Sequence, residues 1–436
     1  MKEIVCRIQY DDKFVKEHAD FIVDLFSKEQ YHYTFWDKNK RKLYQGGNFS
    51  KSAIDLLYIS LMVYYADRRV IRHKENDAWT RNIKLYIPVL ELDKWNNNKA
   101  LLERMLSFLS GDLWAFEFRK RELNFKEERA IKGINRKKKN HQPKAICMLS
   151  GGLDSFIGAI DILSKEKDIW FVGHYGGGKG VIQYQKKVNE KLIAQYKLAS
   201  EQFYNFYAAP VKPNKYVLME DTTRTRSFMF FAHAIILGSV TKEDITLYVP
   251  ENGLISLNIP LTNTRLGSSS TRTTHPYYMD LLQKLLINIG LKIKLYNPYQ
   301  FKTKGEMIAN CKDPGFLKAN ISQTMSCSHP DLGRYEGDAR PSHCGNCLPC
   351  IIRRAAIEFA YKTDNSNYRD KNFQKKEASD NLRSFKLGIT DFINSKIDTA
   401  LSIQISGPIV DNIDNYCGVY KRGMNEMKSI LDKYDG

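Results

Sequence analysis

The chain of 436 residues contains no run of 18 apolar residues, so we expect no transmembrane helix. Its first residues, Met1 to Ile4, include a glutamate and lead into no apolar segment, so we also expect no signal peptide. Internal repeats are absent. The chain has only eight cysteines, four of which form one cluster, and nothing marks it as secreted, so a reducing, cytoplasmic location is expected.

The chain has fewer acidic than basic side chains: 49 Asp and Glu against 67 Lys and Arg, which gives a net charge of +18. Residues 119–139 alone hold ten basic and three acidic side chains. Such a charge can attract nucleic acid or an acidic protein. No zinc-finger helix or RNP-like motif accompanies it, so a solvated linker over 119–142 and a phosphate-binding site are favoured over specific DNA reading.

The lysine-containing Walker A pattern is also missing, but another glycine-rich turn is present. An apolar run over 144–149 predicts a buried strand, and the apolar residues of 156–163 predict a helix. Between them stands Ser150-Gly151-Gly152-Leu153-Asp154-Ser155. Glycines, backbone N–H groups and a helix N-terminus can form an anion site, and an aspartate beside a polyphosphate implies Mg²⁺ between the two. The alternative is an ordinary Gly-Gly turn with a capped helix.

A second cluster consists of cysteines at three-residue spacing, Cys344, Cys347 and Cys350, with Cys327 upstream. Four such thiolates can converge on one tetrahedral Zn²⁺. His329 and His343 are rival ligands, although four cysteines already complete a structural site. Buried free thiols and an iron–sulfur cluster are the alternatives, and a disulfide pair is disfavoured in a reducing compartment.

The hexapeptide resembles the PP-loop of the ATP pyrophosphatases, which cleave ATP between the α and β phosphates. With the cysteine cluster, residues 144–360 resemble the 7-cyano-7-deazaguanine synthase (QueC) family. Further elements recur in order: Tyr175-Gly176 after a strand, an arginine-centred stretch over 224–232, and Lys304-Gly305-Glu306. The chain departs from the family at Arg226-Ser227, in the gap before Cys344, and over 251–276. These departures look more like the QueC-like QatC proteins of anti-phage systems.

The resemblance implies ATP- and Mg²⁺-dependent adenylation of 7-carboxy-7-deazaguanine, followed by attack of an amine. The standard enzyme uses ammonia and then forms a nitrile. Here the acceptor amine could belong to a protein partner in a defence complex, because the family core is enlarged at both ends and the charge is high. The alternatives are a tRNA thiolase of the same superfamily and a non-catalytic nucleotide-binding subunit of a defence complex.

The resemblance also assigns roles. Expected catalytic residues are Asp154, Arg226 and Lys304. ATP and Mg²⁺ are expected at Ser150, Gly151, Gly152, Asp154, Ser155, Tyr175 and Gly176. The carboxylate or the acceptor is expected at Arg224, Arg265, Arg272 and His275, and the deazaguanine ring on Tyr175 or Tyr277. Zn²⁺ is expected at Cys327, Cys344, Cys347 and Cys350.

Strand candidates near 144–149, 169–173, 203–208, 245–250 and 293–297 alternate with helical stretches. This rhythm predicts an α/β fold with a doubly wound parallel sheet over 143–364, whose ligands bind at the carboxyl ends of the strands. Glu251-Asn252-Gly253 and Asn297-Pro298 fall at such ends. Residues 1–118 are predicted to form an α+β accessory domain that docks a partner or covers the site, and residues 365–436 a helical region.

Overall fold

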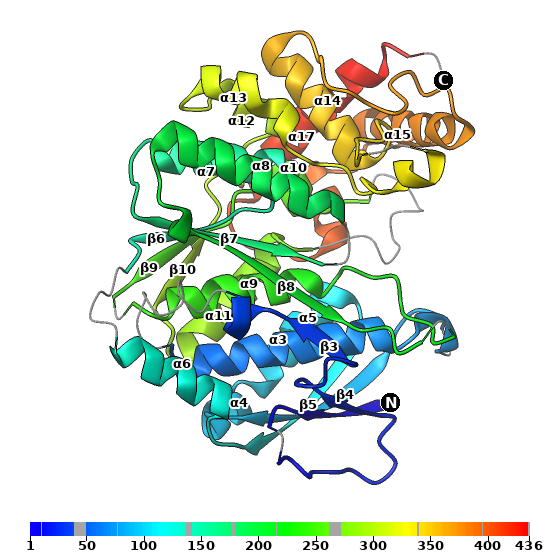
Figure 1. The fold of residues 1–436 in the computed structure, drawn as a ribbon. Coiled ribbons are helices and arrows are strands. Elements are labelled where there is room, and N and C mark those ends of the chain that lie inside the picture. Colours follow the sequence, from blue (N-terminus) through cyan, green and yellow to red (C-terminus); the bar gives the residue numbers. More distant parts are fainter. Residues whose placement is uncertain are drawn as a thin grey trace.

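The protein is described by a computed structural model. It describes residues 1–9, 11–38, 49–75, 77–136, 142–176, 179–214, 216–241, 243–260, 272–337, 340–394 and 396–434. Figure 1 shows a large sheet at the centre, helices on both of its faces, and a smaller sheet beyond one helical layer.

The central sheet has six strands in the order β10-β9-β6-β7-β8-β3. All neighbours pair in parallel except β3 and β8, which pair antiparallel. The five strands predicted for the core are therefore confirmed, and β6 lies where the chain order reverses, between β7 and β9. The strands are β3 (Tyr31–Tyr33), β6 (Ala145–Met148), β7 (Ile169–Tyr175), β8 (Phe203–Pro210), β9 (Ile245–Tyr248) and β10 (Ile293–Tyr296).

Successive residues of β6 enter different cores, as the pleat of a strand requires. Ala145 and Cys147 pack in the core beneath α7 and α8, whereas Ile146 and Met148 pack in the core that holds α9 and α11. The sheet is thus doubly wound, as predicted, and its central strand β6 is apolar and buried along its whole length because both faces are covered. The covering helices are α7 (Leu153–Leu163), α8 (Lys179–Tyr196), α9 (Arg226–Gly238) and α11 (Pro276–Asn288).

The N-terminal region forms a second sheet in the order β2-β1-β4-β5, and every pairing in it is parallel. The region is therefore α/β in type rather than the expected α+β. Helix α3 (Lys51–Arg69) lies between the two sheets and packs on α9, with nearly all of its residues buried (Figure 1). The other elements are β1 (Lys2–Arg7), β2 (Phe21–Asp24), α1 (Phe35–Lys38), β4 (Asn82–Val89), α4 (Leu92–Asn97), α5 (Lys99–Ser110) and β5 (Leu113–Lys120).

The N-terminal region shares its hydrophobic core with the central sheet. Strand β3 extends that sheet at β8, and the Phe35 ring packs 5.1 Å from the Phe206 ring, centre to centre. One continuous buried cluster runs from Ile4 to Ile293. Within the segment expected as a linker, β5 ends at Lys120 and helix α6 (Phe125–Arg136) follows.

The described part of residues 365–436 is helical, as predicted, with α15 (Lys376–Asn394), α16 (Thr399–Ile403) and α17 (Ile413–Leu431). The later part of the predicted core adds α10 (Gly253–Leu257), α12 (Lys304–Ala309), α13 (Pro314–Asn320) and α14 (Leu348–Tyr361). In Figure 1, α12, α13 and α14 lie above the α7–α8 layer. Short 3-10 turns lie at Arg72–Lys74, Ser200–Gln202, Ile321–Gln323, Leu332–Glu336 and Gln404–Ser406. Among the described helices, none combines the length and the apolarity needed to cross a membrane.

Candidate active site and metal centre

The glycine-rich turn joins β6 to α7 as the sequence predicts. Gly151 has φ +82°, and a Cβ there would lie 3.0 Å from the backbone nitrogen of Gln185, so both conformation and space favour glycine. The Gln185 amide donates to the Ser150 carbonyl at 3.2 Å. The Ser150 and Ser155 hydroxyls lie 3.1 Å apart at the start of α7. The turn is therefore held in place, with two hydroxyls beside a helix N-terminus where an anion is favoured.

A cavity of about 280 Å³ opens in front of this turn, close to the lower end of the range for small-molecule sites. It collects residues from the carboxyl ends of β6, β7 and β9 and from the start of α9. The Arg226 side chain is exposed in it. The lining residues are Met148, Ser150, Ser155, His174, Tyr175, Gly176, Val181, Thr223, Arg226, Ser227, Phe230, Val249, Pro250, Glu251, Thr273 and Thr274.

Two other predicted site residues, Asp154 and Lys304, meet beside this cavity. Lys304 Nζ lies 3.0 Å from Asp154 Oδ1, and both side chains are less than a tenth exposed. Asn252 Nδ2 donates to Asp154 Oδ2 at 2.6 Å, and the Asn252 backbone N–H donates to the same oxygen at 3.2 Å. Burial alone would raise the pKa of Asp154, but the Lys304 ammonium, with hydrogen bonds from Glu251 and Asn252, lowers it. Asp154 is therefore ionised.

Glu251 follows β9 and lies at a strand end where the sequence predicts ligands, but sequence reasoning gave its side chain no role. Its carboxyl group lines the cavity and hydrogen-bonds to Asp154. Burial and the negative charge of Asp154 raise the pKa of Glu251 well above its ordinary value, so Glu251 is a neutral acid beside an ionised one. Its place at the end of a strand next to the reversal of strand order was the available signal. The two carboxyl groups offer the oxygen ligands that Mg²⁺ prefers.

The helix that carries Lys304 is held from two sides. Thr303 caps α12: its hydroxyl accepts from the Glu306 N–H at 3.1 Å, and Glu306 Oε2 accepts from the Thr303 N–H at 2.9 Å. The carboxyl group of Glu426, on α17, accepts from the Thr303 hydroxyl and from the Gly305 N–H. A Cβ on Gly305 would lie 2.6 Å from Glu426 Oε1, so this contact requires glycine. In Lys304-Gly305-Glu306, only the lysine faces Asp154, and its two neighbours build the helix start.

The other predicted substrate residues lie outside the cavity lining. Arg224 Nη1 donates to the Ser110 carbonyl at 2.6 Å, and Arg272 Nη1 donates to the Phe108 carbonyl at 2.6 Å. His275 is buried as the cap of α11, with Nε2 3.3 Å from Ser406 Oγ. Burial, followed by the charge of Arg272, lowers the pKa of His275 to about 3. All three side chains thus contact neighbouring structural elements, and Arg265 lies outside the described residues. Their substrate roles stay predictions.

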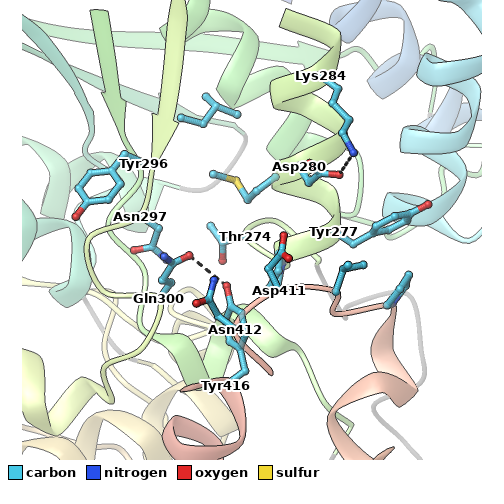
Figure 2. Close-up of a pocket in the computed structure, with 15 residues that line it drawn as sticks. Thr274, Tyr277, Asp280, Lys284, Tyr296, Asn297, Gln300, Asp411, Asn412 and Tyr416 are labelled. Atoms are coloured by element: carbon cyan, nitrogen blue, oxygen red, sulfur yellow. Dashed lines mark hydrogen bonds and ion pairs between the residues drawn. The ribbon is translucent and has the colours of Figure 1, made fainter. Parts of the chain in front are cut away.

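Tyr277 lines a second cavity, of about 340 Å³, between α11, the end of β10 and the start of α17 (Figure 2). Thr274 lines both cavities. The Tyr416 hydroxyl donates to Gln300 Oε1 at 3.1 Å on the second cavity's lower side in that view. Of the two predicted stacking residues, Tyr175 therefore lies at the PP-loop cavity and Tyr277 at this neighbouring one.

The four predicted cysteine ligands come together. Their sulfur atoms all lie within 4.8 Å of one another, with Cys327 to Cys347 at 3.9 Å and Cys344 to Cys350 at 3.8 Å. Four sulfurs bound at 2.3 Å to one tetrahedral ion are about 3.8 Å apart, so the spacing fits a single Zn²⁺. An iron–sulfur cluster would spread the thiolates over several irons.

Backbone N–H groups complete the surroundings of the cluster. The N–H of Cys344 points at the sulfur of Cys327 at 3.4 Å, and that of Cys347 at the sulfur of Cys344 at 3.3 Å. Such donors stabilise thiolates bound to a metal. The rival His343 instead accepts from the Ser326 N–H at 3.3 Å, and neither His329 nor His343 belongs to the ligand group of the described residues. The donor set therefore fits a closed structural zinc site.

Comparison with known proteins adds to this geometry. Residues 273–361 match the family model described as "Queuosine biosynthesis protein QueC". The 7-cyano-7-deazaguanine synthase of Leptospira interrogans is 24% identical over 246 residues, which cover 52% of this chain and 91% of that protein. The synthase of Helicobacter acinonychis is 24% identical over 237 residues, covering 49% and 96%. The 7-cyano-7-deazaguanine synthase 1 of Mesorhizobium japonicum is 33% identical over 81 residues, covering 19% and 30%. No solved structure gives a significant match.

Proposed function

We propose that this chain is a member of the QueC family, that it uses ATP to adenylate 7-carboxy-7-deazaguanine, and that it transfers the activated acyl group to an amine. The family relationship supports ATP-dependent ligase-type chemistry. The observation that carries the proposal is the buried pair of Lys304 and Asp154, which stands beside a serine-lined cavity at the reversal point of a parallel sheet.

In the proposed reaction, a carboxylate oxygen of the deazaguanine attacks the α-phosphorus of ATP, and pyrophosphate leaves. The amine then attacks the acyl carbon, AMP leaves, and the amine gives up a proton. The PP-loop N–H groups with Ser150 and Ser155 bind the phosphates, and Arg226 stabilises charge that develops on them. Mg²⁺ would be held by Asp154, with Glu251 as the adjacent oxygen ligand. Tyr175, in the cavity wall, is the candidate to stack on the deazaguanine.

Substitution of Lys304 tests whether the Lys304–Asp154 pair belongs to the active site. Replacing Lys304 with Met removes the cation beside Asp154, and pyrophosphate release with the deazaguanine acid should fall about 100-fold or more, as for other single electrostatic groups in active sites. The matched control is Lys302→Met, two residues away, because Lys302 is exposed. Equal rates for the two variants, both folded by circular dichroism, would reject the assignment.

We propose further that the acceptor amine belongs to a protein, within an anti-phage defence complex. The net charge of +18 supports recruitment of an acidic partner. In the test, the protein is incubated with ATP, 7-carboxy-7-deazaguanine and co-expressed partner proteins, with and without ammonia. Mass spectrometry then follows both the small molecules and the intact proteins. A mass increment on a partner supports conjugation. Nitrile formed from ammonia at an enzyme-like rate, with no modified protein, contradicts it.

The same assay separates the remaining alternatives. A tRNA thiolase would release pyrophosphate only with tRNA and would incorporate sulfur into it. A non-catalytic nucleotide-binding subunit would bind ATP without releasing pyrophosphate under any of these conditions. The intact hexapeptide and the ionised Asp154 support catalysis over the second alternative.

A further inference from the structure

A third cavity, of about 580 Å³, lies beside the cysteine cluster and has a basic lining. Its walls come from α8, the turn at 321–323, and residues 340–343 and 366–369. No aspartate or glutamate is among the lining residues that the structure describes. They are Tyr184, Lys187, Ser322, Arg340, Pro341, Ser342, His343, Arg353, Ser366, Asn367, Tyr368 and Arg369.

Arg353, on α14, is fully buried, and yet its guanidinium has only neutral partners. Nη1 donates to Thr324 Oγ1 at 2.7 Å, and Nη2 donates to the Ile321 carbonyl at 2.7 Å. Nε has no partner among the described residues, and the partners of the other two nitrogens are uncharged. A buried cation without a counter-charge is costly, because neither water nor a carboxylate compensates for its lost hydration.

Three other buried arginines of the chain show how such a charge can be compensated. Arg81 Nη2 lies 2.5 Å from Asp67 and 2.6 Å from Asp112. Arg121 Nη1 lies 2.8 Å from Glu127. Arg354, next to Arg353, donates to three oxygens and lies 4.9 to 5.4 Å from three aromatic ring centres. Arg353 differs from all of these because it is buried beneath an open basic cavity.

We propose that this cavity binds a small phosphate-type oxyanion, with Arg353 at its base and Lys187 and Arg340 at its mouth. Phosphate oxygens would accept hydrogen bonds from the guanidinium groups of Arg353 and Arg340 and from the Lys187 ammonium, and would supply the negative charge that the cavity lining lacks. The inference does not depend on the proposed deazaguanine substrate, since it rests on the charges of the cavity alone.

The site would lie one layer away from the PP-loop. Met325, next to the Thr324 that holds Arg353, donates its N–H to the Gly151 carbonyl at 2.9 Å. On the other wall, Tyr184 lines the cavity, and the next residue, Gln185, donates its side-chain amide to the Ser150 carbonyl. Two walls of the cavity therefore rest directly on the PP-loop, so an oxyanion bound there would be close to where pyrophosphate is released.

The test is calorimetric titration of the full chain with inorganic phosphate at constant ionic strength, with the PP-loop cavity saturated by a non-hydrolysable ATP analogue. The wild-type protein should bind one phosphate per chain. The double variant Lys187→Ala/Arg340→Ala should bind it about tenfold more weakly, because it loses two charge-assisted contacts from exposed side chains that the fold does not need. The control Lys186→Ala/Lys191→Ala removes the same charge from exposed positions of α8 and should bind phosphate like the wild type.

A third variant, Arg353→Gln, checked for folding by circular dichroism, should also lose phosphate binding. Absence of phosphate binding to the wild-type protein would overturn the proposal, and so would equal weakening in the control pair, which would show general charge attraction. A loss of single-stranded RNA binding in Lys187→Ala/Arg340→Ala with phosphate binding unchanged would also overturn it, because the surface would then serve a nucleic acid instead.

Discussion

Glu426 joins the C-terminal helix α17 to the start of the Lys304 helix, and its ionisation offers a quantitative test of that contact. Burial raises the pKa of Glu426 from 4.5 to about 7, despite the hydrogen bonds from Thr303 and Gly305. In the unfolded chain the carboxyl group ionises near its ordinary value. Below about pH 4.5 the group is protonated in both states and contributes nothing to the pH dependence.

Between these two values the unfolded state loses its proton first, so the free energy of unfolding falls as the pH rises from about 4.5 to 7, and stays low above 7. A shift of about 2.5 pKa units corresponds to about 3 kcal/mol. Glu426→Gln removes this ionisation and keeps an oxygen that can accept from Gly305. Its stability relative to wild type should therefore rise by up to about 3 kcal/mol between pH 4 and pH 8.

The assay is chemical denaturation of the wild type and of Glu426→Gln at pH values from 4 to 8. The control is Glu377→Gln on α15, because Glu377 is exposed and its replacement should leave the pH profile parallel to that of the wild type. Parallel profiles for Glu426→Gln as well would refute the reasoning. That result would mean that the carboxyl group ionises in the folded protein as it does in water, and that α17 does not enclose it.

Three further predictions concern the metal, the PP-loop and the N-terminal region. Elemental analysis should find one zinc per chain, and Cys344→Ser should lose it with local unfolding of 327–350; iron in its place would contradict the assignment. Asp154→Ala should abolish pyrophosphate release while the protein stays folded, because Glu251 can then ionise beside Lys304; an unchanged rate in a folded variant would reject the PP-loop role. Removal of residues 1–118 should leave an insoluble product, because β8 and α9 lose their cover; a soluble and active remainder would disprove this.

The local motifs could be predicted because residues close together in the sequence determine both their structure and their chemistry. The Ser-Gly-Gly-Leu-Asp-Ser turn needs only a strand before it and a helix after it, and both are set by short-range apolar patterns. The cysteine spacing likewise fixes three of four ligands within one turn of α14 and the loop before it. Lys304 was found through its resemblance to a family motif, and the buried contact with Asp154 explains why a lysine stands there.

Side-chain direction was harder to predict than position. Arg224 and Arg226 are two residues apart in one polar stretch, yet Arg226 is exposed in the PP-loop cavity and Arg224 donates to Ser110 of α5. Which arginine faces the ligand depends on where α9 begins and on what α5 covers, and both follow from packing between segments more than 100 residues apart. Glu251 was placed at a strand end but given no role for the same reason: its neighbour Asp154 is brought close only by the pairing of β6 with β9.

The same long-range packing changes the argument about the acceptor. In the sequence, the extra N-terminal and C-terminal regions favoured a protein acceptor because no structural role for them was known. In the structure, β3 extends the central sheet at β8, α3 packs on α9 and β8, and Glu426 of α17 holds the start of the Lys304 helix. Both extensions are therefore parts of the framework that positions the candidate site, so their presence alone does not argue for docking. The case for a protein acceptor then rests on the basic charge, and the acylation assay with co-expressed partners tests it directly.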